Sequence, residues 1–157
     1  MKNFLTPFFI FLFFLVACEK EFNTNFPTPE KKAKVIDVFP KSIEKHKPLL
    51  KKLSLPFGLS GFEGIYGETD YIIRIILFVK QESFSPKSYL EQIIFPLYKT
   101  KGKTGLKKEG GERQVSARTK DGSFFYAWTK SDWLMEIQVK DEKKLEILLK
   151  SFPYLSK

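Results

Sequence analysis

The fold is decided by residues 115–139, which read VSARTKDGSFFYAWTKSDWLMEIQV. Asp121-Gly122 is a strong signal for a two-residue hairpin turn, and a second tight turn follows at Ser131-Asp132. Counting outward from the two turns places apolar side chains opposite one another on one face of three strands. The expected pairs are Thr119–Phe124, Ala117–Tyr126 and Val115–Trp128, then Trp128–Met135, Tyr126–Ile137 and Phe124–Val139. A slip of one residue would destroy this agreement, so the stretch predicts a three-stranded antiparallel meander in this register.

The opposite face of the meander carries two large apolar side chains, Phe125 and Leu134. In the predicted register, Arg118, Glu136 and Gln138 lie near them. We expect a second layer of helix to cover this face, and the alternative is that it forms a binding surface.

Two helices are predicted on either side of the meander in the chain. Asp141 can cap a final helix that Pro153 ends, and Ser85-Pro86 is a favourable start for an earlier helix that Pro96 ends or kinks. Each helix has apolar residues at positions i, i+3, i+4 and i+7, which form one face. These residues are Leu145, Leu148, Leu149 and Phe152 in the final helix, and Leu90, Ile93, Ile94 and Leu97 in the earlier one.

The strongest strand signal is at residues 71–79, YIIRIILFV, where Arg74 is the one residue that is not apolar. A strand that is apolar on both faces lies inside a sheet and is covered on both sides. A turn at residues 67–70 predicts a hairpin to a strand at 62–66. Further upstream we expect a short strand at 34–39 and a short helix on one or both sides of Pro48 within 41–53.

These elements predict an α+β fold: an antiparallel sheet with a C-terminal three-stranded meander, packed with two or three helices. We assign residues 33–157 to a single domain. The element order resembles that of small α/β sandwich envelope proteins such as the PsbP-like and Mog1-like domains. A likeness of element order implies a fold and no function.

The amino terminus has the pattern of a secretory signal. One lysine, Lys2, precedes an uncharged apolar run at residues 4–17, FLTPFFIFLFFLVA, and the chain's single cysteine, Cys18, follows it. Fourteen residues make about 21 Å of helix, whereas the core of a bilayer requires roughly 20 apolar residues. The run is therefore too short to span a membrane.

Residues 15–18, Leu-Val-Ala-Cys, resemble the lipobox of bacterial lipoprotein precursors. The resemblance implies removal of residues 1–17 as a signal peptide, attachment of a diacylglycerol to the Cys18 sulfur, and acylation of the new amino terminus, typically with palmitate. Residues 18–32, polar and interrupted by prolines, then form a flexible tether. The expected location is the bacterial cell envelope, bound to a membrane by the lipid, and to the outer membrane rather than the inner where there are two.

The chain is basic, with a formal net charge of +9, which falls to +8 without Lys2. In an exported protein the candidate polyanions are anionic surfaces of the envelope and not nucleic acid, and the interpretation we favour is that the lysine-rich surface keeps the domain soluble. Residues 99–108, KTKGKTGLKK, are the densest basic stretch and are predicted to form a loop. We interpret the stretch either as a solvated loop or as a polyanion contact, the candidate residues being Lys99, Lys101, Lys103, Lys107 and Lys108.

Nothing in the sequence indicates catalysis, a metal site or a cofactor. His46 is the one histidine, which excludes any site that needs two, and we expect it on the surface. Lipidation would use the only thiol. Gly102-Lys103-Thr104 looks like the end of a phosphate-binding P-loop, but Leu97 stands where that motif requires its first glycine.

The sequence therefore favours a lipid-anchored envelope protein that acts as a non-catalytic binding or interaction module. Its expected partners are the membrane, through Cys18, and an unidentified envelope protein or polyanionic surface. Two alternatives stay open: a carrier of small molecules or lipids with an apolar pocket, and a surface adhesin that binds polyanions through the lysine-rich stretch. A deep apolar cavity would favour the carrier, and a filled core the interaction module.

Overall fold

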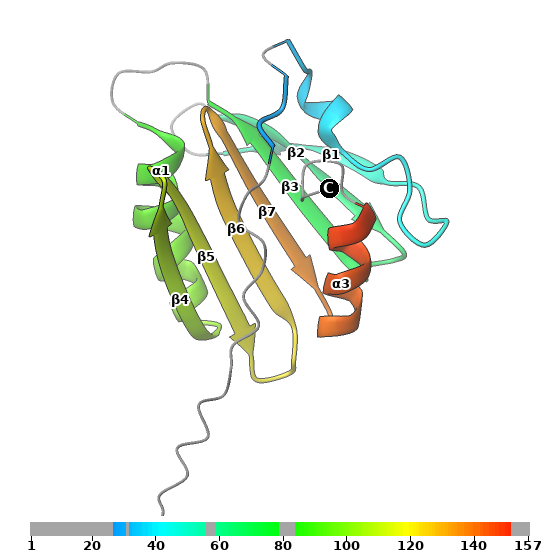
Figure 1. Ribbon diagram of the computed structural model, residues 1–157. Coiled ribbons are helices and arrows are strands. Elements are labelled where there is room, and N and C mark those ends of the chain that lie inside the picture. The colour runs from blue at the N-terminus through cyan, green and yellow to red at the C-terminus, as the bar shows by residue number, and fades with distance from the viewer. Residues whose placement is uncertain (1–26, 31, 56–58, 79–83, 152–157) are drawn as a thin grey trace, which may run out of the picture.

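The computed structural model describes residues 27–30, 32–55, 59–78 and 84–151 (Figure 1). The predicted signal peptide, Cys18 and most of the predicted tether lie outside these residues. Seven strands form one sheet, with bounds β1 Leu49–Ser54, β2 Ser60–Tyr66, β3 Tyr71–Leu77, β4 Gly102–Glu109, β5 Glu112–Thr119, β6 Phe124–Lys130 and β7 Trp133–Val139. The helical elements are η1 Val35–Val38, α1 Pro86–Tyr89, η3 Leu90–Ile94, α2 Phe95–Lys99 and α3 Glu142–Ser151.

The sheet is antiparallel throughout and has the order β1-β2-β3-β7-β6-β5-β4. Strands β1 to β3 form one meander and β4 to β7 another, and β7 pairs with β3 at the middle of the sheet. The segment α1-η3-α2 carries the chain from β3 to β4 at the far edge. The predicted α+β class and the C-terminal meander are therefore confirmed, and the meander has β4 as an additional strand.

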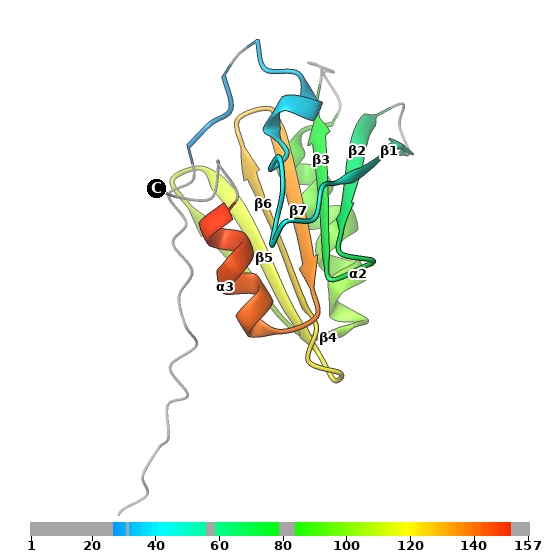
Figure 2. The same ribbon diagram turned by 90° about the vertical axis from the view of Figure 1, so that its right-hand side faces the viewer.

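Helices cover both faces of the sheet. Figure 2 shows α3 on one face and α2 on the other. The η1–α3 face holds one buried cluster, which includes Tyr126, Trp128 and Leu148, and the α1-η3-α2 face holds a second, which includes Phe125 and Leu134. The second helical layer expected over Phe125 and Leu134 is therefore present.

The register between β5 and β6 differs by one residue from the prediction. Arg118 lies opposite Phe124 and Val115 opposite Ala127, whereas the pairs across β6 and β7 are as predicted. The cause is the turn: the Gly122 N–H donates to the Thr119 carbonyl at 3.1 Å and the Thr119 N–H donates to the Ser123 carbonyl at 3.0 Å. The loop therefore contains three residues, 120–122, with Gly122 at φ +89°, as in a type I turn followed by a glycine bulge.

The shift moves Val115 and Ala117 to the α1-η3-α2 face, where both are buried. Arg118 moves the other way and lies over the ring of Phe124, so the prediction that it neighbours Phe125 is wrong. On the α3 face Gln114 now meets Tyr126, whose hydroxyl donates to the Gln114 side chain at 3.0 Å.

We expect Gly122→Ala to lower the free energy of unfolding by about 1 kcal/mol, because a side chain with Cβ is disfavoured at positive φ. The matched control is Gly105→Ala in β4, where the new Cβ would make one ordinary contact with Ser116 Oγ, at 3.6 Å. Because alanine gives the unfolded chain less conformational freedom than glycine, Gly105→Ala should leave the free energy of unfolding unchanged or raise it slightly. Urea unfolding measures both variants, and equal effects would contradict the role given to the turn.

The helical segment α1-η3-α2 begins like a regular helix and departs from one in its middle. Ser85 caps it as predicted, its hydroxyl accepting from the Ser88 N–H at 3.2 Å. Pro96 does not end the helix, because the π-helical turn η3 precedes it and the chain continues through α2 to Lys99. The extra residue of this turn rotates the apolar face, so Tyr98 is buried while Leu97 is 49% exposed.

Three upstream predictions are wrong. Residues 34–39 contain the 3-10 helix η1 and not a strand, since the Asp37 carboxylate accepts from the Lys34 N–H and closes a local turn. Residues 49–54 form the edge strand β1 and not a helix, with Pro48 just before its start. The lysine-rich residues 99–108 end α2 and form most of β4, and are not a loop.

The final helix is as predicted at its start, where an Asp141 side-chain oxygen accepts from the Lys144 N–H at 2.9 Å. Phe152 and Pro153, predicted to complete and end it, lie outside the described residues. In the part of the chain that the structure describes, no helix has the length and apolar character needed to cross a bilayer.

Candidate anion-binding site

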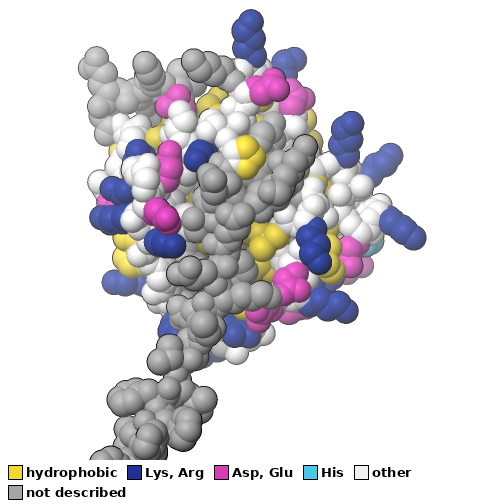
Figure 3. Space-filling model, in the orientation of Figure 1, with side chains coloured by type: hydrophobic (Ala, Val, Ile, Leu, Met, Phe, Trp, Pro, Cys, Tyr) yellow, Lys and Arg dark blue, Asp and Glu magenta, His cyan; other side chains and the backbone are white. Residues whose placement is uncertain are grey.

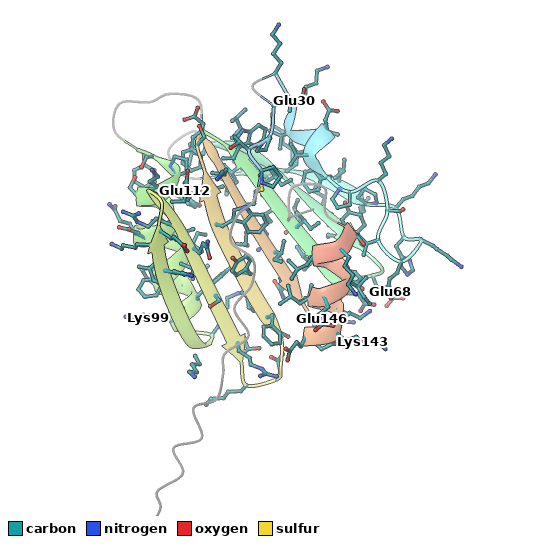
Figure 4. The ribbon with its side chains drawn as sticks, viewed as in Figure 1. Glu30, Glu68, Lys99, Glu112, Lys143 and Glu146 are labelled. Carbon is teal, nitrogen blue, oxygen red and sulfur yellow. The ribbon has the colours of Figure 1, made fainter. Side chains whose placement is uncertain are left out.

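The five candidate lysines fall at the two ends of β4. Figure 4 shows Lys99 at the end of β4 where the strand begins and Glu112 at the opposite end. At the Glu112 end, Lys107 pairs with Glu109 and Lys108 with Glu91, each at 3.1 Å. Lys99, Lys101 and Lys103 lie toward the other end, so the structure does not gather all five lysines into one site.

Two further cations, from β5 and from the turn that follows it, lie at the same end of β4 as Lys99, Lys101 and Lys103. Arg118 lies directly opposite Lys103 in the β4–β5 ladder, and Lys120 lies in the turn between β5 and β6. We call this group the basic end and define it as Lys99, Lys101, Lys103, Arg118 and Lys120. Figure 3 shows basic side chains along the edge over β4, with acidic side chains among them.

Three charges of the basic end lie over aromatic rings. The Nζ atom of Lys99 is 4.9 Å from the centre of the Phe95 ring, that of Lys101 is 4.0 Å from Phe125, and the Arg118 guanidinium carbon is 4.8 Å from Phe124. A ring attracts a cation by about 0.5–1 kcal/mol at an exposed position without neutralising it. These rings therefore orient the cations and leave their charge available.

Four of the five cations of the basic end are not neutralised by carboxylates in the described part of the chain. Within the described residues, Lys99, Lys101, Arg118 and Lys120 form no ion pair. Arg118 also faces a like charge, Lys103, across the ladder, an arrangement that destabilises a sheet. Lysines on an edge strand have another explanation, because they prevent the strand from pairing with other chains. This explains the lysines of β4 but not Arg118 in β5 or Lys120 in the turn.

An open hollow of about 500 Å³ lies at the basic end. It is formed where the α2–β4 connection, the β5–β6 turn and the end of β7 meet, and Phe125 and Ser123 contribute to its lining. The remaining lining residues are Thr100, Lys101, Thr119, Lys120, Asp121 and Gln138. Of the residues singled out in the sequence as polyanion candidates, Lys101 alone lines it.

Asp121 is held in place at the rim of the hollow. Its carboxylate accepts from the hydroxyl of Thr119, from the Ser123 N–H at 3.3 Å and from the Ser123 hydroxyl at 3.3 Å. The Thr119 hydrogen bond, followed by that from the Ser123 N–H, lowers the pKa of the Asp121 carboxyl below its usual value. The residues that line the hollow therefore include two lysines and one ionised aspartate.

A second polar cluster lies on the α1-η3-α2 face of the sheet. Glu63, Arg74 and Glu136 stand in one row across β2, β3 and β7. The Arg74 Nε donates to Glu63 at 2.7 Å and its Nη1 donates to Glu136. Burial lowers the pKa of Arg74, but Glu136 and then Glu63 outweigh it and the pKa is raised. One guanidinium binds both carboxylates. The row therefore has a structural role, which is to hold β2, β3 and β7 together.

Other candidates from the sequence carry no chemistry in the structure. His46 is exposed, as predicted. Gly102-Lys103-Thr104 begins β4 and does not form a loop before a helix, so the structure agrees with rejecting a P-loop. Among the described residues, no group of three histidine, cysteine, aspartate or glutamate side chains could hold a metal ion.

Sequence reasoning missed Lys120, Gln138 and Asp121 as neighbours of Lys101. The sequence marks Asp121 as a turn residue, and it places Gln138 near Phe125 and Leu134 on a face interpreted as covered by a helix or as a binding surface. The sequence does show Lys120 next to the turn. That this turn lies beside Lys101 depends on the register of β5 and on the path of α1-η3-α2, which the sequence does not show.

No protein-family model and no curated protein sequence matches the chain. A similar solved structure is that of a GTP binding regulator from Thermotoga maritima, with a TM-score of 0.53 and 10% sequence identity. The match covers 82% of this chain and 94% of that one. At this identity the likeness shows a shared fold and carries no ligand or partner.

Proposed function

We propose that this protein is a lipid-anchored component of the bacterial cell envelope whose α+β domain is a non-catalytic binding module for anionic partners. The anchor is the lipid that the lipobox resemblance implies on Cys18, and the binding surface is the basic end. The observation that carries the binding role is the set of cations held over Phe95, Phe125 and Phe124 without a carboxylate partner among the described residues.

The packing of the domain favours an interaction module over a carrier. Large apolar side chains fill the space between the sheet and each helical layer, including Trp128 on one face and Leu90 on the other. The hollow is an open surface feature with charged groups at its rim, whereas a carrier of apolar ligands needs an enclosed apolar space. The adhesin alternative shares the basic end and differs in where the partner lies, outside the cell and not in the envelope.

The binding role is tested with dextran sulfate, a soluble polyanion, and the full chain in a non-ionic detergent. Each lysine or arginine near an anionic surface contributes on the order of 1 kcal/mol, so removing three should weaken binding about 100-fold. The variant is Lys101→Gln with Arg118→Gln and Lys120→Gln, and affinity is measured at low and physiological salt because screening reduces the effect.

The matched control removes the same number of charges elsewhere: Lys52→Gln with Lys107→Gln and Lys108→Gln. We expect less than a threefold change for it. Equal losses in the two variants would show a response to net charge alone, and binding that is unchanged in the first variant would reject the basic end as the binding surface.

A further inference from the structure

The hollow at the basic end is bordered by residues with basic, acidic and amide side chains. Lys101 lines it from the α2–β4 connection and Lys120 from the β5–β6 turn, so two basic residues from separate elements border one space. An ammonium group is a common protein ligand of phosphate, binding as a point charge. This pair supplies the recognition of an anionic group.

The same hollow contains groups that a bare anion would not use. The Asp121 carboxylate is ionised and oriented by Thr119 and Ser123, and it would repel an isolated phosphate. A carboxylate has about four lone-pair positions that can accept hydrogen bonds. Asp121 uses three of them for hydrogen bonds from Thr119 and Ser123, so it can still accept one from a ligand hydroxyl. Asp121 therefore favours a ligand with a hydroxyl-bearing part beside its charge.

Gln138 adds a second hydrogen-bonding group from β7. Its side chain lines the hollow, is half-buried, and makes no hydrogen bond to any described residue. An amide offers two donors and an acceptor and suits the mixed donor and acceptor character of a hydroxyl. The Thr100 hydroxyl donates to the Leu97 carbonyl at 2.7 Å, so it keeps only acceptor capacity for a ligand.

We infer that this hollow binds a phosphorylated polyol, with Lys101 and Lys120 on the phosphate and Asp121 and Gln138 on the hydroxyl groups. The inference rests on the proposed function and names the ligand class of the same surface. A volume of about 500 Å³ lies within the usual range of about 300–1,000 Å³ for small-molecule sites and accommodates more than a phosphate ion. The ligand is either the headgroup of a membrane lipid or a free sugar phosphate, since the two share this chemistry.

The experiment measures binding of three probes to the full chain in a non-ionic detergent by titration calorimetry: glucose 6-phosphate, glucose and inorganic phosphate. We expect glucose 6-phosphate to bind at least tenfold more tightly than either of the others. Lys101→Gln and Lys120→Gln should each weaken it at least tenfold, and Gln138→Leu should weaken it while leaving inorganic phosphate unchanged. Lys107→Gln with Lys108→Gln is the control and should change nothing.

Equal affinity for glucose 6-phosphate and inorganic phosphate would overturn the inference, as would no binding of glucose 6-phosphate. In either case retained binding of dextran sulfate would leave the proposed function standing. A further arm uses dihexanoyl phosphatidylglycerol below its micelle concentration. Where glucose 6-phosphate binds, tighter binding of this lipid supports the site with a lipid headgroup as ligand, and weaker binding supports it with a free sugar phosphate.

Discussion

Arg74→Met is expected to lower the free energy of unfolding by about 3 kcal/mol. Removing one partner of a buried ionic group leaves an uncompensated charge, at a cost of about 3–5 kcal/mol, and here two carboxylates would remain. The Glu136 and Glu63 side chains are only 7% and 16% exposed. We take the lower end of the range because the Arg74 side chain is 31% exposed, so water already screens part of the interaction. In a domain with a total stability of about 5–15 kcal/mol this is a large share.

The measurement is urea unfolding followed by tryptophan fluorescence, since Trp128 and Trp133 are both buried. Arg118→Met is the control: the residue is exposed and contacts the Phe124 ring, so its loss should cost no more than about 1 kcal/mol. Replacing the whole row, Arg74→Met with Glu63→Leu and Glu136→Leu, should restore most of the loss because no buried charge remains. An equal loss in the triple variant would show that packing and not charge accounts for the effect.

Cys18→Ala is expected to abolish lipid attachment. Each buried methylene contributes about 0.8 kcal/mol, so two or three acyl chains hold a protein on a membrane effectively permanently, whereas one gives only reversible binding. Cells grown with radioactive palmitate should label the wild-type chain and not the variant. Membrane fractionation should recover the wild-type protein with membranes even at high salt.

Incorporation of palmitate is the decisive measurement. Membrane fractionation alone does not decide, because an uncleaved apolar segment at residues 4–17 binds membranes without any lipid. Lys20→Gln, two residues beyond Cys18, is the control and should be labelled like the wild type. Equal labelling of the Cys18→Ala variant, or no labelling of the wild type, would reject the lipid anchor.

The strands and turns around the meander were predictable because their signals are local. Strand β3, the hairpin at residues 67–70 and the β6–β7 register follow from apolar runs and turn residues that lie next to one another in the chain. The β5–β6 register was not, since Asp121-Gly122 serves a two-residue turn and a three-residue loop with a glycine bulge equally well. The one-face argument failed to separate them because helices cover both faces, so Val115 and Ala117 are buried in either register.

The candidate site shows the same division. The sequence marked Lys101 within a basic stretch but treated five lysines as one group, and β4 separates them by its length. The sequence does not indicate that Glu63 and Glu136 share a guanidinium, because Arg74 and Glu136 are 62 positions apart and meet only when β7 is placed beside β3.

The sequence by itself determined the α+β class, the meander, the capped starts of the helices and the pattern from which a signal peptide and lipid anchor are inferred. These depend on the order of neighbouring residues, which the chain carries directly. Only the tertiary structure decided the register of β5, the ionic row through Arg74 and the meeting of Lys101, Lys120, Asp121 and Gln138 around one hollow. The physical reason is that these arrangements depend on which strands become neighbours and which faces are covered. Burial on both faces of the sheet, and not the local pattern, makes that choice.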